Sequence, residues 1–185
     1  SALTILLKDG IKKLKMDAVA SGAGIAKGTV YLYYKNKNAL LDALLDHAYE
    51  PLQKDLHRII LAKDEPLNKL ENCIRVCLQH SEDNKFLLRQ LRTVLFASMD
   101  IRISDKNSWY WTLADKLGKV LEEAAATGTI RPVNYVKISS LFIDSINSLM
   151  SRRILSEVNE TIEQDVEEMM DLYLNGLKNN ILSEE

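Results

Sequence analysis

Apolar side chains recur every three or four positions along almost the whole chain of 185 residues. This spacing places them on one face of an α-helix. No stretch alternates apolar and polar residues in the way that a half-buried β-strand does. We therefore expect an all-α protein.

Residues 15–41 predict two short helices joined by a tight turn, followed by the start of a third helix. Met16, Val19 and Ala20 share one helical face, and the small Ala20 allows a second helix to cross closely. Gly24 can adopt a positive φ in the turn, and we expect Ile25 to enter the crevice between the helices. Val30 and Tyr34 would close this core. The pattern predicts a helix-turn-helix, although an ordinary αα corner with solvated lysines would share the same spacing.

Further helices are predicted downstream. Asn36 is placed to cap a helix that begins at Lys37, and Pro51 should kink or split that helix or open a separate short one. The ranges expected for the other helices are 3–14, 66–80, 84–99, 108–126, 132–156 and 160–181. We place a helix-turn-helix domain at residues 1–46 and a larger helical domain, for effector binding and dimerisation, at residues 47–185.

The last two predicted helices carry apolar residues over more than the ~100° that one core requires. Such wide apolar surfaces favour a four-helix bundle shared by two subunits, although burial within one protomer would also explain them. The residues predicted for the dimer interface are Leu141, Ile146, Leu149, Val166, Met170, Tyr173, Leu174 and Leu177.

Charge is distributed unevenly along the chain. Residues 1–41 contain seven lysines against Asp9 and Asp17, whereas the remainder contains 17 Lys or Arg against 24 Asp or Glu. Between Asp17 and Asp42 there is no carboxylate, and the second helix of the motif exposes cationic, hydroxyl and aromatic groups. A surface of this composition suits a polyanion such as DNA.

The run Ala-Gly-Ile-Ala-Lys-Gly-Thr-Val-Tyr-Leu-Tyr-Tyr-Lys-Asn-Lys-Asn-Ala-Leu-Leu at residues 23–41 resembles the signature of the TetR family of bacterial transcriptional regulators. The preceding Met-Asp-Ala-Val-Ala is similar to the family's second helix. The resemblance is specific over residues 11–45 and architectural beyond them. The family usually extends several residues further at the N-terminus, often as a basic arm.

The resemblance implies roles for individual residues. Those that would reach base edges are Lys27, Gly28, Tyr31 and Leu32, and those that would hold phosphates are Thr29, Tyr33 and Lys37. Two positions depart from the family pattern, because Lys15 and Ala26 stand where a hydroxyl usually caps a helix. Lys15 could still reach a phosphate, but Ala26 could not. The resemblance also implies dimerisation through the last two helices and an effector pocket.

Motifs for catalysis are absent: the chain has no Gly-x-Ser-x-Gly, no phosphate-binding glycine loop and no His-Glu-x-x-His. Cys73, Cys77 and His80 lie one helical turn apart, which is compatible with three metal ligands. The same spacing marks a buried stripe, and free cysteine is among the most buried residue types. We therefore expect core packing there, with no enzyme activity, no resident metal and no cofactor.

Trp109, Tyr110 and Trp111 point about 100° apart on a helix, so they cannot all enter one core. At least one should line a cavity, a subunit contact or solvent. The residues predicted for an apolar effector site are Phe96, Met99, Trp109, Trp111, Leu113 and Phe142, with Arg89 or Arg92 as the polar anchor. Core packing plus one surface Trp is the alternative.

Together these features predict a homodimeric transcriptional regulator that binds a palindromic DNA operator. We expect a repressor that a small apolar or amphipathic effector releases from DNA; control by a protein partner, or by a metal at Cys73, Cys77 and His80, is the alternative. No apolar run approaches the ~18 residues of a membrane span, and no signal peptide is visible. The expected location is the cytoplasm, on the nucleoid when bound to DNA, with no membrane partner.

Overall fold

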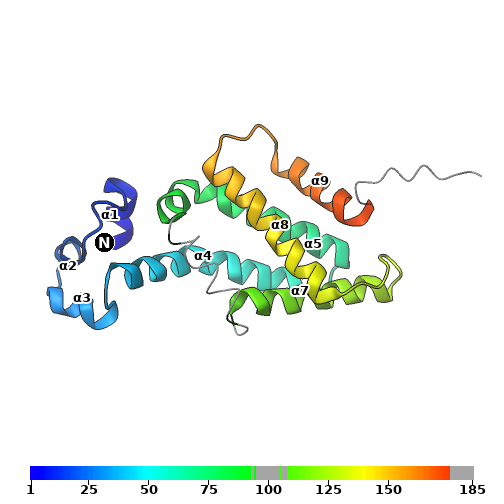
Figure 1. The fold of residues 1–185 in the computed structure, drawn as a ribbon, viewed down its shortest axis with the longest axis horizontal. Coiled ribbons are helices and arrows are strands. Elements are labelled where there is room, and N and C mark those ends of the chain that lie inside the picture. The colour runs from blue at the N-terminus through cyan, green and yellow to red at the C-terminus, as the bar shows by residue number, and fades with distance from the viewer. Residues whose placement is uncertain (93, 95–104, 106–107, 176–185) are drawn as a thin grey trace, which may run out of the picture.

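The computed structural model describes residues 1–92, 94, 105 and 108–175, and every regular element within them is an α-helix. The prediction of an all-α protein is confirmed. In chain order the helices are α1 (Ala2–Asp9), α2 (Met16–Ala23), α3 (Lys27–Tyr33), α4 (Lys37–Leu61), α5 (Pro66–Asp83), α7 (Trp109–Ala126), α8 (Tyr135–Leu155) and α9 (Ile162–Asn175). Residues 85–92 are also helical. Figure 1 shows a small head, formed by α1 to α3, joined by the long α4 to a larger helical body.

The head encloses its own apolar core. Met16, Val19, Ala20 and Val30 are buried in it, as the helical spacing predicts. Gly24 adopts a positive φ of 67° and ends α2, while the amide of Ile25 donates to the carbonyl of Ala20 at 3.1 Å. This is a Schellman turn, which satisfies carbonyl groups at the end of the helix. The expectation that Ile25 enters the crevice is wrong: the side chain is 44% exposed, because its backbone, rather than its side chain, makes the turn.

Helix α4 runs from the head into the body without a break. The Asn36 side chain accepts a hydrogen bond from the amide of Ala39 at 2.9 Å, which confirms the predicted cap. Pro51 neither splits α4 nor opens a new helix, so these two expectations are wrong, while the expected kink stays a prediction. Pro51 and His47, one turn before it, are both exposed, so water can satisfy the carbonyl group that loses its amide partner.

Two cores meet along α4. Leu40, Leu41, Leu44 and Leu45 belong to the core of the head, whereas Leu52, Leu56 and Ile60 belong to that of the body. The proposed division between residues 46 and 47 therefore falls where one core gives way to the other. It also falls inside a continuous helix, so any movement of the head relative to the body must involve α4.

Several helices are shorter than expected, each for a local reason. Helix α1 ends at Asp9 because Gly10 has a φ of 78°, although Leu14 beyond it is still buried. Helix α8 starts after Pro132, because the Asn134 side chain accepts from the amide of Lys137 at 3.1 Å. Helix α9 starts after a capping box, in which Thr161 and Gln164 each bond the other's amide.

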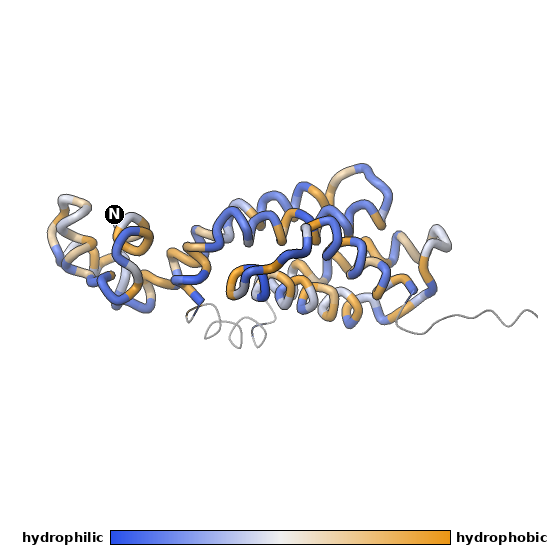
Figure 2. Tube along the Cα trace, turned by 90° about the horizontal axis from the view of Figure 1, so that it is seen from above, coloured by the Kyte–Doolittle hydropathy of each residue, from blue (hydrophilic) through white to orange (hydrophobic). Residues whose placement is uncertain are grey.

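The body packs α4, α5, α7, α8 and α9 around one core. Figure 2 shows orange apolar segments along these helices, with blue segments between them. Within the described ranges, no helix combines the length and the apolar character that crossing a membrane requires.

Residues 85–92 connect the head and the body. Leu91 is fully buried in the core of the head, and the Gln90 side chain accepts from the amide of Ile11 at 3.4 Å. On the body side, Leu88 packs with Ile154 at the end of α8. Arg89 donates to the carbonyl of Ile154 at 3.0 Å. This short helix thus contacts the end of α8 and the interior of the head at once.

Candidate DNA-binding surface and effector cavity

Helix α3 presents an exposed face that contains most of the predicted DNA contacts. Leu32 and Tyr33 are 84% and 77% exposed, and Lys27, Gly28 and Tyr31 are exposed as well. Thr29 is half-buried. Val30 faces the other way, into the core of the head, and so anchors α3 against α2. Because Val30 fixes the rotation of α3, the remaining side chains lie together on the surface.

Lys27 is paired with a carboxylate that the sequence did not place beside it. Its ammonium lies 2.8 Å from Oδ1 and 3.0 Å from Oδ2 of Asp17, at the start of α2. The Asp17 hydrogen bond raises the pKa of Lys27 above its ordinary value. The same ammonium lies 6.0 Å from the centre of the Tyr31 ring. The sequence has no carboxylate from residue 18 to residue 41, but the packing of α2 on α3 places the Asp17 carboxylate beside this surface.

The Lys37 side chain also has a hydrogen-bond partner within the head. Its ammonium donates to the carbonyl of Ile11 at 2.7 Å, and the residue is half-buried. A phosphate contact by Lys37 therefore requires the exchange of this carbonyl for a phosphate oxygen. Lys15 is exposed, and in the described head neither Lys15 nor Ala26 makes a side-chain cap, as their residue types predict.

Cys73, Cys77 and His80 are buried along α5. Burial raises the pKa of the Cys73 thiol to about 12 and also raises that of Cys77. Metal binding requires deprotonated thiols, and no group of three His, Cys, Asp or Glu within the described residues could hold a metal ion. The His80 ring packs against Tyr49, with centroids 5.4 Å apart. These positions support core packing.

The predicted effector residues lie in different places. Trp109 and Leu113 border a hollow of only about 30 Å³, far below the ~300–1,000 Å³ typical of ligand sites. Arg89 holds the end of α8 instead of facing this hollow. Trp111 packs against the core of the body. Phe96 and Met99 lie outside the described residues, so an effector site that includes them stays a prediction.

A larger cavity lies at the opposite end of the body from the head. Its volume is about 560 Å³, which falls within the ~300–1,000 Å³ typical of ligand sites. Phe142 lines it, together with Leu67, Leu70, Leu121, Thr129, Ile130, Arg131, Val133, Ile138, Met170, Tyr173, Leu174 and Asn175. Ten of these thirteen side chains are apolar or aromatic. Arg131 is the one charged residue of the lining, and it makes no ion pair within the described part of the chain.

The head matches a known family. Residues 1–44 match the family model described as bacterial regulatory proteins, tetR family. The head therefore belongs to the TetR family of DNA-binding domains. The match covers α1 to α3 and the start of α4, and the predicted helix-turn-helix at residues 15–41 lies inside it.

Relatives extend the similarity beyond the head to almost the whole length of the chain. The uncharacterized HTH-type transcriptional regulator YvaF of Bacillus subtilis is 25% identical over 177 residues, which cover 93% of this chain and 90% of YvaF. The fold resembles that of FadR from Thermus thermophilus, a TetR-family transcriptional repressor solved with lauroyl-CoA. The TM-score is 0.70 at 20% identity, over 96% of this chain and 91% of FadR.

The fold also resembles that of AibR, solved with isovaleryl coenzyme A and operator DNA. Here the TM-score is 0.58 at 16% identity, over 92% of each chain. At these identities the two structures establish the fold of the body. The family match at residues 1–44 shows that the head is the helix-turn-helix domain of a DNA-binding transcriptional regulator, and a larger helical domain follows it.

The residues predicted for the dimer interface divide into two groups. Ile146, Val166 and Met170 are buried in the protomer's own core, so they have little surface to offer a second subunit. The wide apolar face arises because α8 and α9 pack against several helices of their own chain. Of the others, Leu141 and Leu174 are exposed, Leu149 and Tyr173 are half-buried, and Leu177 lies outside the described residues.

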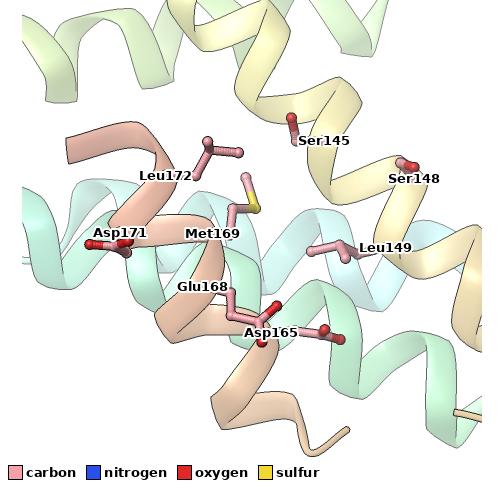
Figure 3. A pocket seen from close by; sticks show the side chains of 8 residues that line it. All are labelled: Ser145, Ser148, Leu149, Asp165, Glu168, Met169, Asp171 and Leu172. Atoms are coloured by element: carbon pink, nitrogen blue, oxygen red, sulfur yellow. The ribbon is translucent and has the colours of Figure 1, made fainter. Parts of the chain in front are cut away.

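An open groove of about 470 Å³ lies between α8 and α9. Figure 3 shows Ser145, Ser148 and Leu149 on α8 facing Met169 and Leu172 on α9. Small serines on one side and exposed Leu172 on the other would let another helix approach closely. The exposed interface candidates therefore extend to Leu172, which helical spacing alone did not predict.

Proposed function

We propose that this protein is a dimeric transcriptional repressor, that it binds a palindromic operator through α3 of each subunit, and that an amphipathic acyl ligand releases it. The observation that carries ligand control is the 560 Å³ apolar cavity bordered by α8 and α9. The DNA-binding part rests on the exposed face of α3 and on the family match.

In this proposal α3 enters the major groove. Lys27, Gly28, Tyr31 and Leu32 contact base edges, while Lys15, Thr29, Tyr33 and Lys37 contact phosphates. A lysine ammonium can donate to O6 and N7 of guanine, and an aromatic or aliphatic side chain can touch a thymine methyl group. Two heads related by a two-fold axis would read two half-sites of opposite orientation, which is why the operator should be palindromic.

Acyl thioesters are the proposed effector class. FadR and AibR, which share this fold, were solved with lauroyl-CoA and isovaleryl coenzyme A. The walls of the cavity are mostly apolar and so suit a hydrocarbon chain, while Arg131 supplies a cation for an anionic or strongly polar head group. Arg131 thus takes the anchoring role that the sequence analysis assigned to Arg89.

Helix α8 connects the cavity to the residues that contact the DNA-binding head. Ile138 and Phe142 line the cavity near its start, and Ile154 at its other end is held by Leu88 and Arg89. Leu91, one turn further along residues 85–92, is buried in the core of the head. A ligand that displaces α8 would therefore change how residues 85–92 pack against the head. Ligand and operator would then weaken each other's binding by the same factor.

The test uses a duplex selected from random DNA by the wild-type protein, with binding followed by fluorescence anisotropy. We expect lauroyl-CoA or isovaleryl-CoA to reduce operator binding and coenzyme A alone to have little effect. Val133→Trp should obstruct the cavity and abolish the response while operator binding persists. Val136→Trp is the matched control, because Val136 is exposed and lies outside the cavity lining.

Two results would separate the parts of the proposal. If a palindrome is selected but no acyl-CoA changes the affinity, the assigned effector class is wrong and the DNA-binding part stands. If Val133→Trp and Val136→Trp respond like the wild type, the ligand binds elsewhere, and the predicted site around Phe96 and Trp109 becomes the next candidate.

A further inference from the structure

The Asp17–Lys27 pair lies on the predicted DNA-reading surface. Asp17 is in the first turn of α2, and Lys27 is the first residue of α3. Both carboxylate oxygens lie within 3.0 Å of the ammonium, although both side chains are mostly exposed. Burial therefore does not hold the carboxylate and the ammonium together. The contact forms because α2 packs against α3, which places Asp17 within reach of the first side chain of α3.

We propose that Asp17 is a specificity-determining residue, which prevents Lys27 from binding phosphates indiscriminately and directs it to a base edge. The inference rests on the proposed function, in which α3 reads the major groove. An unpaired lysine on this surface would bind any phosphate within reach of its flexible stem, and phosphate contacts favour every DNA sequence alike.

The chemistry of the ammonium explains how one pair can discriminate. An ammonium group has three donors, so Lys27 can stay on Asp17 and still donate to O6 or N7 of guanine. A phosphate is a different partner, because its negative charge repels the Asp17 carboxylate. Lys27 must then leave Asp17, and the new contact replaces an existing one. Asp17 thus penalises phosphate binding more than base binding.

The position of Lys27 over Tyr31 agrees with this role. The ammonium lies 6.0 Å from the ring centre, on the exposed side of α3. Asp17 on one side and the Tyr31 ring on the other restrict the region that the ammonium can occupy. A lysine restrained in this way loses less freedom when it meets a base than a free lysine does.

The experiment compares Asp17→Asn, Lys27→Gln and the double variant in the full chain. Asp9→Asn is the matched control, because it removes the same charge from the head and Asp9 makes no ion pair with another described residue. The probes are the duplex selected by the wild type and a scrambled duplex of equal length, titrated at several salt concentrations. Asp17→Ser serves as a second variant if Asp17→Asn misfolds, and circular dichroism checks the folding of each protein.

We expect Asp17→Asn to strengthen binding to the scrambled duplex by ~2- to 5-fold per subunit beyond the effect of Asp9→Asn, the range expected for loss of an exposed ion pair. The salt slope on that duplex should steepen by ~0.9 per subunit, as one phosphate contact is gained. The ratio of selected to scrambled affinity should fall. In the Lys27→Gln background, Asp17→Asn should act like Asp9→Asn.

Two outcomes would overturn the inference while leaving the proposed function intact. One is an Asp17→Asn variant that keeps the wild-type affinity ratio. The other is an Asp17→Asn effect of equal size with and without Lys27. If Lys27→Gln binds both duplexes like the wild type, then Lys27 does not contact DNA, and both the inference and the assigned role of Lys27 fail.

Discussion

Arg153 is buried at the end of α8, and its guanidinium ties three parts of the body together. It bonds Asp165 of α9 through Nε at 2.8 Å and Nη2 at 2.6 Å, Glu82 of α5 at 2.9 Å, and the carbonyl of Glu160 at 2.9 Å. Arg153 and Asp165 are each only 3% exposed. Burial lowers the pKa of Arg153, but the hydrogen bonds and charges of Glu82 and Asp165 outweigh burial and raise it.

Replacing Asp165 by Ala should be strongly destabilising, because it leaves a buried cation without its closest anion. Breaking a buried pair in this way typically costs ~3–5 kcal/mol of the free energy of unfolding. Glu82 and the Glu160 carbonyl remain as partners, so we expect the lower end, about 3 kcal/mol. For a protein of this size that corresponds to a fall in Tm of ~6–12 °C.

Thermal unfolding followed by circular dichroism measures the effect, at one protomer concentration because the stability of the proposed dimer depends on it. Asp115→Ala is the control, since its pair with Lys119 is exposed and should contribute only ~0–1 kcal/mol. The double variant Arg153→Met/Asp165→Leu should recover most of the loss, because it removes both buried charges. If Asp165→Ala is no more destabilised than Asp115→Ala, Arg153 does not depend on Asp165 in solution.

Three further predictions concern assembly, DNA binding and pH. Leu141→Arg with Leu172→Arg should yield a folded monomer by sedimentation velocity, because both leucines are exposed in the protomer; an unchanged dimer would rule out this interface. Lys37→Ala should lower the salt slope by ~0.9 per subunit, or ~1.8 for the dimer, if Lys37 exchanges the Ile11 carbonyl for a phosphate. An unchanged slope would leave Lys37 a purely structural role. Burial lowers the pKa of His80 below 6.5 in the folded protein, so the unfolded chain binds a proton at His80 more readily. The free energy of unfolding should therefore decrease as pH falls through 6.5 toward the folded pKa. His80→Leu should flatten this dependence in urea titrations, and parallel curves for both proteins would contradict it.

The sequence anticipated the features that neighbouring residues decide. Gly24 ends α2 with a positive φ, and Asn36 caps α4. Each effect operates within one turn of helix, so the residue types themselves are sufficient to predict it. Pro51 shows the limit of this reasoning. Its effect depends on whether the freed carbonyl faces water or protein, and that is a property of the surroundings.

The dimer candidates show a second limit. A wide apolar face predicts that a helix is covered on more than one side, but not whether its own chain or a partner covers it. Ile146, Val166 and Met170 are covered by their own chain, whereas Leu141 and Leu174 are not. The effector site shows the same limit, because helical spacing does not reveal where side chains fail to fill space.

The amino-acid sequence by itself determined the all-helical fold, the helix-turn-helix and the exposed face of α3, because these follow from periodicity and from hydrogen bonds within a few residues. The tertiary structure alone decided the partners of distant groups. It placed Asp17 on Lys27, the Ile11 carbonyl on Lys37, and Arg89 on the end of α8. It also placed the 560 Å³ cavity among four helices and a loop. Such contacts depend on how helices pack, and packing is set by the shape of the whole core rather than by any local stretch of the chain.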